Sequence, residues 1–282
     1  MANIQSKIKG ALFGFAIGDA MGATTEFMTA HEVEKLYGQV NDIIGGGWLH
    51  LKPGQITDDT QMMLCVCEAI ERFPQNTSLM LNRCCENFSN WYLSRPIDIG
   101  GCCRAVISQC KGTNNHKVWL RIADDPSSLG NGSLMRTLPI ILSGLDEDAA
   151  LSQGRLTHNN RVCDFAISAY KANIESLLFA GGRFLHKSET LNEPTGHVLN
   201  TLENSLYWVQ NTDSLEDAII GAVNHGGDAD TIAAITGSFA GALYGYEAIP
   251  KRWIDKLDPV IRIDLEKYAK LFENFNQKVC TK

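Results

Sequence analysis

The sequence GALFGFAIGDAMG at residues 10–22 places a glycine at every fourth position, and GSFAGALYG at residues 237–245 repeats this spacing. On a helix, residues four apart share one face. Each glycine costs about 1 kcal/mol against alanine in a helix, so a regular stripe needs a compensating interaction. Close packing of one backbone on another supplies it. We therefore predict two buried helices that cross near each other; the alternative is that residues 10–22 partly form a loop.

Helical periodicity also dominates the rest of the chain. The segment from Met62 to Phe73 is almost wholly apolar apart from one narrow polar stripe, as in a largely buried helix. Alternating runs bracketed by turns are lacking. We predict an all-α fold, a compact orthogonal helical bundle forming a single domain over residues 1–282. The predicted helices cover residues 62–73, 79–93, 164–180, 197–209, 214–223 and 231–244.

Three stretches rich in glycine, asparagine, aspartate and proline are predicted to be long loops. They cover residues 41–56, 111–133 and 181–196. Long loops in a compact helical protein are often functional. None resembles a flexible linker, which is consistent with one domain.

The chain of 282 residues carries a formal net charge of -7. An acidic protein without lysine- or arginine-rich runs is a poor match for nucleic acid, which requires a basic surface. The same charge suits a site that gathers carboxylates around cations. We therefore expect no nucleic-acid partner.

The nine cysteines form no CxxC motif, and adjacent pairs such as Cys84 and Cys85 rarely make good bridges. We expect free thiols in a reducing compartment. The N-terminal segment, in which lysines precede an apolar run that starts at Ala11, loosely resembles a signal peptide. Asp19 interrupts this apolar run early. No segment approaches the roughly 20 apolar residues that span a bilayer. We expect a cytoplasmic protein without membrane contact.

Acidic residues cluster at the predicted starts of two buried helices. Thr57-Asp58-Asp59 precedes one of these helices, and Asp228-Ala229-Asp230-Thr231 precedes the other. Glu26 follows the first glycine stripe. A single acidic residue at such a position is an ordinary helix cap, and Asp58 with Gln61 would form a capping box. Doubled carboxylates before two buried helices are harder to explain in this way.

Helix dipoles favour an anion by only about 0.3–1 kcal/mol, whereas burying several unpaired carboxylates costs far more. Divalent cations resolve this conflict. The candidate ligands are all oxygen donors, which hard ions such as Mg²⁺ or Mn²⁺ prefer, and their number suggests two ions in one cleft. The candidate metal ligands are Glu26, Thr57, Asp58, Asp59, Asp228, Asp230 and Thr231.

The acidic motifs and the segments around them resemble the ADP-ribosylglycohydrolase family. The matching segments are GALFGFAIGDAMGATTEF (10–27), GQITDDTQMMLC (54–65), GNGSLMRTLPI (130–140), Thr157-His158 and NHGGDADTIAAITGSFAGALYG (224–245). They occur in the family's order and extend over most of the chain. Two positions depart from the family: Cys102 and Cys103 replace two threonines after Asp98-Ile99-Gly100, and Ala233 replaces a glycine.

The resemblance implies a compact all-α fold with two Mg²⁺ or Mn²⁺ ions held by the candidate ligands above. It also places ADP-ribose against the loop after Gly130. The implied substrate contacts are Asn131, Gly132, Ser133 and His158. Without the family, an ordinary Asn-Gly turn would be the preferred interpretation of this loop, and His158 would be interpreted as a structural histidine.

The resemblance implies a metal-dependent hydrolase that removes ADP-ribose from a modified protein side chain, with arginine the preferred acceptor. Asp58, Asp59 or Glu26 would act as general base on an attacking water. The expected partners are a mono-ADP-ribosylated protein and a cognate ADP-ribosyltransferase, in metabolic regulation or in immunity against a toxin. The alternatives are a non-catalytic immunity protein that occludes a transferase, and a two-metal phosphohydrolase.

Overall fold

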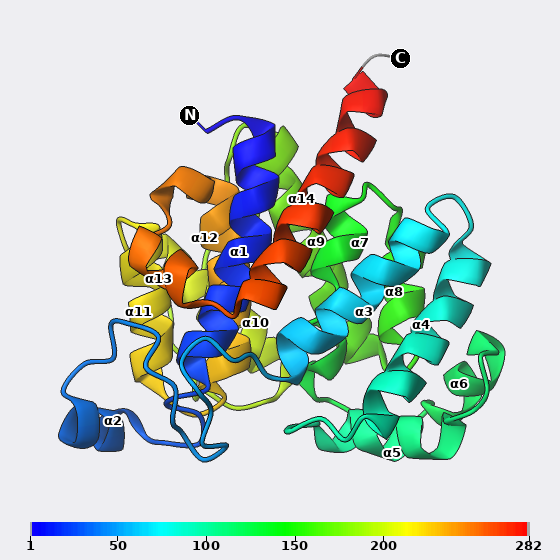
Figure 1. Ribbon diagram of the computed structural model, residues 1–282, viewed down its shortest axis with the longest axis horizontal. Helices are drawn as coiled ribbons and strands as arrows, with labels where there is room; N and C mark the ends of the chain where they lie inside the picture. The colour runs from blue at the N-terminus through cyan, green and yellow to red at the C-terminus, as the bar shows by residue number, and fades with distance from the viewer. Residues whose placement is uncertain (1, 281–282) are drawn as a thin grey trace. The chain divides into compact units, whose positions relative to one another are not determined.

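A computed structural model describes residues 2–280, which form α-helices and two short 3-10 helices (Figure 1). This part of the chain contains isolated β-bridges and no sheet, so the predicted all-α fold class is confirmed. Its contacts divide it into two compact units. Residues 2–57, 172–196 and 200–280 belong to the first unit, and residues 58–171 and 197–199 to the second. The single domain over residues 1–282 stays a prediction.

The first unit is built around the two glycine-striped helices. Its helices are α1 (Ile4–Gly22), α2 (Ala30–Tyr37), α11 (Leu215–His225), α12 (Ala229–Tyr244), η2 (Tyr246–Ala248), α13 (Lys251–Lys256) and α14 (Pro259–Cys280), together with all but the first two residues of α10 (Val198–Gln210). Residues 10–22 are helical throughout, so the alternative of a partial loop is wrong. Helix α12 also begins two residues before its predicted start.

Helices α1 and α12 pack backbone against backbone, as the glycine stripes predict (Figure 1). A Cβ atom added at Gly10 would lie 2.6 Å from the carbonyl oxygen of Gly241. A Cβ atom at Gly14 would overlap the carbonyl of Gly237, and one at Gly18 would overlap that of Ala233. The glycine that the family has at position 233 is thus not required for close approach, because Gly18 provides the space opposite.

The order of these contacts makes the two helices antiparallel. Gly10, near the start of α1, faces Gly241 near the end of α12. Gly22, the last residue of α1, faces Ala229, the first residue of α12. The chain that leaves α1 therefore lies beside the chain that enters α12, and both of these segments carry candidate metal ligands.

The second unit contains most of the central third of the chain. Its helices are α3 (Asp58–Arg72), α4 (Thr77–Leu93), α5 (Gly101–Cys110), α6 (His116–Ile122), η1 (Asn131–Ser133), α7 (Leu138–Leu142) and α8 (Glu147–Gly154), and α9 (Arg161–Phe179) begins in it. Helix α4 packs against α3, α5, α6 and α8. The predicted helices over residues 62–73, 79–93 and 164–180 thus exist, each with an earlier start.

Two of the three predicted loops are confirmed: no helix occurs within residues 41–56 or 181–196. The third, residues 111–133, is wrong in part because α6 and η1 lie inside it. The side chain of Asn115 caps α6 by accepting a hydrogen bond from the N–H of Lys117. Trp119 of this helix is fully buried beside Phe88. Burial of one large aromatic side chain stabilises a helix that local composition does not favour.

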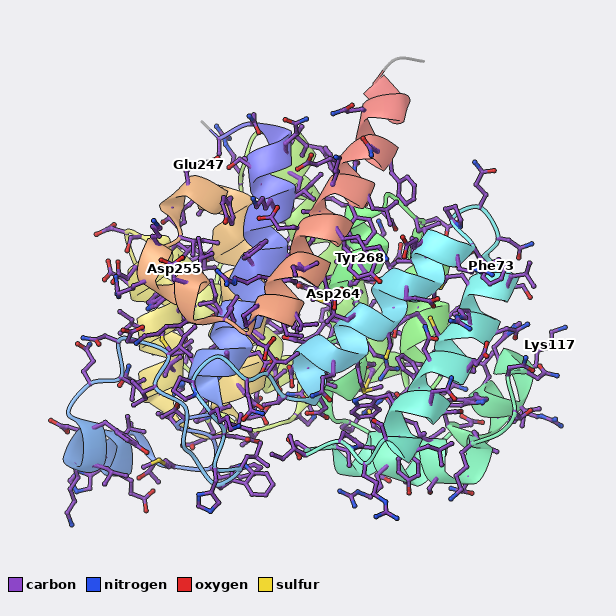
Figure 2. All side chains as sticks on the ribbon, in the orientation of Figure 1. Phe73, Lys117, Glu247, Asp255, Asp264 and Tyr268 are labelled. Carbon is purple, nitrogen blue, oxygen red and sulfur yellow. The ribbon has the colours of Figure 1, made fainter. Side chains whose placement is uncertain are left out.

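Figure 2 shows the side chains of the described residues on the ribbon. Glu247, labelled in that view, accepts a hydrogen bond from Ser6 in the first turns of α1. No helix within residues 2–280 is long and apolar enough to cross a membrane.

The contact between α1 and α12 predicts a large effect of one methyl group. Gly14→Ala should reduce the free energy of unfolding by about 3 kcal/mol, because the new Cβ atom meets a backbone carbonyl that cannot move aside. Gly101→Ala is the control, since a Cβ atom at that helical glycine meets no atom within 4 Å. It should change stability by less than about 1 kcal/mol. Equal stability of the two variants in urea unfolding would contradict the packing described here.

Candidate metal and active site

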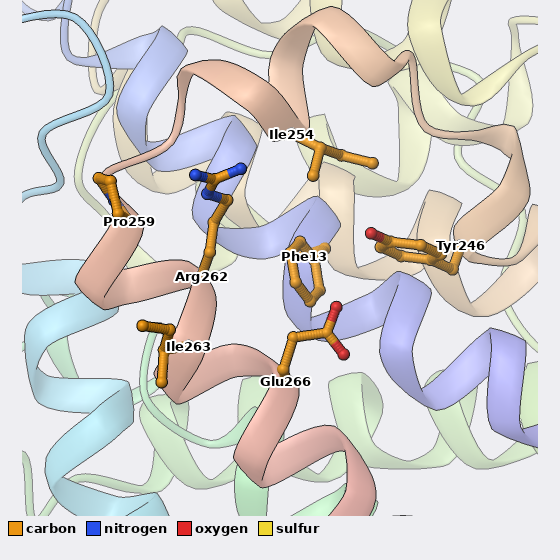
Figure 3. Close-up of a pocket in the computed structure, with 7 residues that line it drawn as sticks. All are labelled: Phe13, Tyr246, Ile254, Pro259, Arg262, Ile263 and Glu266. Carbon is orange, nitrogen blue, oxygen red and sulfur yellow. The ribbon is translucent and has the colours of Figure 1, made fainter.

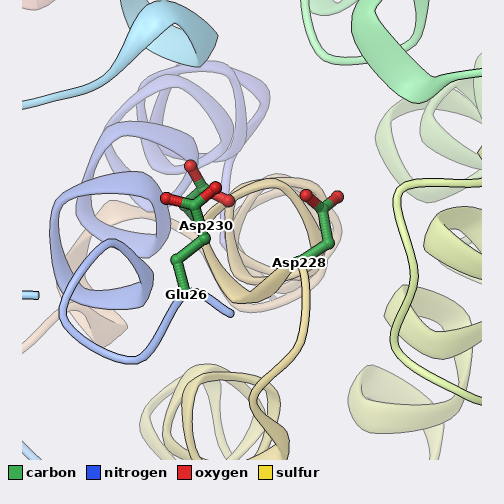
Figure 4. A group of neighbouring side chains, drawn as sticks. All are labelled: Glu26, Asp228 and Asp230. Carbon is green, nitrogen blue, oxygen red and sulfur yellow. The ribbon is translucent and has the colours of Figure 1, made fainter. Parts of the chain in front are cut away.

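Three carboxylates meet where α1 ends and α12 begins (Figure 4). One oxygen from each of Glu26, Asp228 and Asp230 lies within 4.8 Å of the others. Glu26 is only 4% exposed and Asp230 only 2%. The antiparallel contact between the two helices thus brings together acidic residues that lie about 200 positions apart in the sequence.

Thr57 and Asp19 extend this cluster. The backbone N–H of Thr57 donates to Oδ1 of Asp19 at 3.0 Å, and its hydroxyl donates to the same oxygen at 2.9 Å. The hydroxyl oxygen also lies 3.4 Å from Oδ2 of Asp230. Asp19 is fully buried in α1 and therefore fixes the end of the loop that leads to Thr57. No sequence pattern assigned Asp19 this role; its position inside an apolar run was the only signal.

The start of α12 does not have the ordinary capped geometry. Asp228 occupies the N-cap position, but its side chain makes no capping hydrogen bond. Asp230 is the second helical residue, and its Oδ1 accepts from the N–H of Thr231 at 2.8 Å. Asp230 is therefore a helical residue and not the ordinary acidic cap that its position before a predicted buried helix would allow. Capping thus does not explain why two carboxylates stand at this helix start.

The loop before α12 is tied to the chain that leaves α1. The N–H of Phe27 donates to the carbonyl of Gly227 at 2.6 Å, and the N–H of Gly227 donates to the carbonyl of Met28 at 2.7 Å. Gly226 and Gly227 both have positive φ, of 76° and 65°. These two hydrogen bonds hold Glu26 and Asp228 on adjacent segments.

The donor chemistry of this cluster fits a hard divalent cation. Carboxylate oxygens are the ligands that Mg²⁺ and Mn²⁺ prefer. A cation among buried carboxylates also removes the cost of burying like charges together. The residues that could hold such an ion in the first unit are Glu26, Asp228 and Asp230, with the hydroxyls of Thr57 and Thr231 beside them.

Asp58 and Asp59 are the first two residues of α3, in the second unit. Both are buried, and Oδ2 of Asp58 accepts from the N–H of Gly100 at 3.1 Å. Asp58 is therefore a helical residue and not the N-cap of a capping box. The hydrogen bond joins the TDDT segment to the Asp98-Ile99-Gly100 segment within this unit.

The turn that the family resemblance assigns to ADP-ribose is the 3-10 helix η1. A Cβ atom at Gly132 would lie 2.8 Å from Sγ of Cys103 and 3.0 Å from Cε1 of His158. The turn therefore packs directly on a histidine and a cysteine, which explains its glycine. Contacts of Asn131, Gly132, Ser133 and His158 with a substrate stay predictions.

A buried arginine, Arg136, supports this turn by a hydrogen bond to its backbone. Arg136 is fully buried and lies 4.9 Å from the ring centre of Phe88. Its guanidinium donates to the carbonyl of Gly132 at 2.7 Å and to the hydroxyl of Thr157 at 2.8 Å. Burial lowers its pKa from the usual value. No sequence pattern singled out Arg136, because an arginine inside GNGSLMR cannot be distinguished by sequence from a surface arginine.

His158 is held in its neutral form. The ring is 1% exposed, and Nδ1 lies 2.8 Å from the hydroxyl oxygen of Thr157. Burial, with a smaller contribution from the charge of Arg136, lowers the pKa of His158 to about 3. The neutral imidazole of His158 therefore offers a hydrogen-bonding group, but no charge, beside the turn at Gly132.

Cys103, in one of the family's two threonine positions, is a buried thiol beside Arg136. Sγ of Cys103 lies 3.6 Å from Nη1 of Arg136, and burial raises the pKa of this thiol to about 11. The eight cysteines whose side chains are described are free, as predicted. The side chain of Cys280 lies outside the described part.

One neighbour of the acidic cluster was not predicted. Nε1 of Trp48 donates to Oε2 of Glu26 at 2.6 Å, and the indole ring lies 5.4 Å from the ring of Phe27. The only sequence signal was a tryptophan after the three glycines of the first predicted loop.

A hollow of about 450 Å³ lies beside the middle of α1, between α13 and α14 (Figure 3). It contains none of the candidate metal ligands. Its carboxylate, Glu266, pairs with Lys9 at 2.7 Å. Its lining residues are Phe13, Tyr246, Ile254, Pro259, Arg262, Ile263 and Glu266.

Comparison with known proteins agrees with this fold. The sequence model of the ADP-ribosylglycohydrolase family matches residues 1–193 and 166–279. The chain belongs to this family and is a hydrolase. A solved structure titled "ADP-ribosylglycohydrolase-related protein complex" superposes with a TM-score of 0.81 and 27% identity, covering 98% of this chain and 99% of the other.

Two curated relatives have named activities. The "ADP-ribosyl-(dinitrogen reductase) glycohydrolase" of Rhodospirillum rubrum is 34% identical, with 94% of this chain and 95% of the relative aligned. The "ADP-ribosylarginine hydrolase Tri1" of Serratia proteamaculans is 35% identical, with 89% of this chain and 75% of the relative aligned. The family resemblance stated from the sequence is confirmed.

The neutral state of His158 predicts a pH dependence of stability. Its folded pKa of about 3 lies below the ordinary 6.5, so below about pH 6.5 the unfolded chain binds a proton that the folded chain does not. Stability is therefore lost as the pH falls from 6.5 towards 3. In His158→Gln this loss should be shallower by up to about 1.4 kcal/mol per pH unit. Urea unfolding between pH 4 and 7 measures both slopes, and identical slopes would contradict a buried neutral imidazole.

Proposed function

We propose that this hydrolase cleaves the glycosidic bond between ADP-ribose and a modified protein side chain, with arginine as the acceptor. The observation that carries the proposal is the close group of Glu26, Asp228 and Asp230 in a chain of this family. The two named relatives, one of them an ADP-ribosylarginine hydrolase, support the substrate class. A mono-ADP-ribosylated protein is then the partner.

The proposal assigns two Mg²⁺ or Mn²⁺ ions to the ligand set inferred from the sequence. Bound there, the ions would polarise the site and lower the pKa of a water molecule. The proposed ligands are Glu26, Thr57, Asp58, Asp59, Asp228, Asp230 and Thr231.

The protein's own groups have three tasks. Glu26, Asp58 or Asp59 accepts the proton of the attacking water. The anionic cluster stabilises the positive charge that develops on the ribose as the glycosidic bond breaks. The turn at Asn131, Gly132 and Ser133, supported by His158, binds the ADP-ribose. Asp19 contacts no substrate in this scheme; it positions Thr57 through two hydrogen bonds.

Removal of one carboxylate should abolish the reaction without unfolding the protein. In Asp230→Asn, hydrolysis of an arginine-ADP-ribosylated protein should fall at least about 100-fold, because the ligand set loses a charge. Chromatography and mass spectrometry identify the released ADP-ribose. Asp213→Asn, an exposed residue outside the cluster, is the control and should keep full activity.

The same variants can be followed without any substrate. Mn²⁺ should raise the melting temperature of the wild type and of Asp213→Asn, since an ion that binds only the folded state stabilises it. It should not raise that of Asp230→Asn. Full hydrolysis by Asp230→Asn, or by the wild type in excess chelator, would contradict the proposal.

A further inference from the structure

We infer that the exposed rings of Phe27 and Trp48 form the acceptor subsite, where the guanidinium group of an ADP-ribosylated arginine binds. This inference rests on the proposed function and adds to it the residues that distinguish a cationic acceptor from a neutral one. The two rings are named below as the aromatic pair.

The aromatic pair is unusually open for side chains of this size. Phe27 is 66% exposed and Trp48 is 49% exposed. Their ring centres lie 5.4 Å apart with planes inclined at 46°. Two neighbouring aromatic rings left in water forgo the free energy of burial, and an apolar patch of this kind commonly marks a binding site.

The backbone holds Phe27 in place from one side. Its φ is 62°, a left-handed conformation that is strained for a bulky residue. The hydrogen bond from its N–H to the carbonyl of Gly227, at 2.6 Å, fixes that conformation against the loop carrying Asp228. The ring of Phe27 is therefore presented at a defined place beside the acidic cluster.

Trp48 is held from the other side. The residue before it, Gly47, packs so tightly on Ala23 that a Cβ atom would overlap its carbonyl, and the residue after it, Leu49, is buried with Ala23 and Leu51. The indole N–H donates to Glu26 at 2.6 Å. The edge of the indole is thus engaged with a carboxylate of the cluster, while about half of the side chain stays open.

Charge decides which group suits this surface. The carboxylate of Glu26 accepts a hydrogen bond from the indole of Trp48. One oxygen from each of Asp228 and Asp230 lies within 4.8 Å of an oxygen of Glu26. The proposed ligand set has five carboxylates against two divalent ions, so one net negative charge remains beside the aromatic faces. Such a charge attracts a cation and disfavours an anion. A planar guanidinium stacks on aromatic rings better than a compact ammonium does. An arginine side chain whose ADP-ribose reaches the acidic cluster presents such a group.

Phe27→Leu is the test, because it keeps an apolar side chain and removes the aromatic face. Trp48 is a poorer target, since its substitution also releases Glu26. For an ADP-ribosylarginine peptide, kcat/KM should fall about fivefold, the size expected for one cation–π contact. The inhibition constant of free ADP-ribose, which has no guanidinium, should change less than twofold. Phe27→Tyr should behave as the wild type.

Phe165→Leu is the matched control, because Phe165 is likewise exposed, at 61%, and belongs to α9. It should alter neither quantity. Equal loss of kcat/KM and of ADP-ribose affinity in Phe27→Leu, or no change in either, would overturn the acceptor subsite while leaving the proposed function intact. Failure of the wild type to release ADP-ribose from the peptide would instead overturn the proposed function.

Discussion

The direct backbone contact between α1 and α12 sets the register on which the acidic cluster depends. Residues without side chains let the two helices approach until only carbonyls and Cα atoms separate them, as between Gly14 and Gly237. A shift of one or two residues along this contact would bring a Cβ atom into a backbone group. The packing therefore fixes not only the distance between the helices but also which residues lie opposite each other.

This register has an electrostatic consequence. It places the segment after α1, with Glu26, beside the start of α12, with Asp228 and Asp230. Three carboxylates so close together repel one another, and burial increases the cost. A hard cation bound there would convert that repulsion into binding free energy. The glycine stripes and the acidic motifs are thus two parts of one arrangement, in which rigid helices hold charges that a flexible loop would let separate.

The sequence was sufficient for the features that depend on period and charge. The stripes predicted the helix crossing, and the predicted ligand set includes the three acidic residues that the structure brings together, Glu26, Asp228 and Asp230. The sequence was insufficient where contacts between distant residues determine whether a helix forms or which side chain lies beside the acidic cluster. Trp119 stabilises a helix inside a predicted loop, and Trp48 reaches Glu26 from a glycine-rich segment that has no periodicity. Such contacts join positions with no regular spacing, so no local pattern reveals them.

Anomalous X-ray diffraction from crystals grown in Mn²⁺ would test most directly whether the acidic cluster is a metal site. The account predicts manganese peaks at the cluster, with carboxylate oxygens of Glu26, Asp228 and Asp230 at about 2.0–2.2 Å, the distance of close oxygen coordination to a small divalent ion. A well-ordered crystal with these carboxylates in place and no manganese bound to any of them would contradict it.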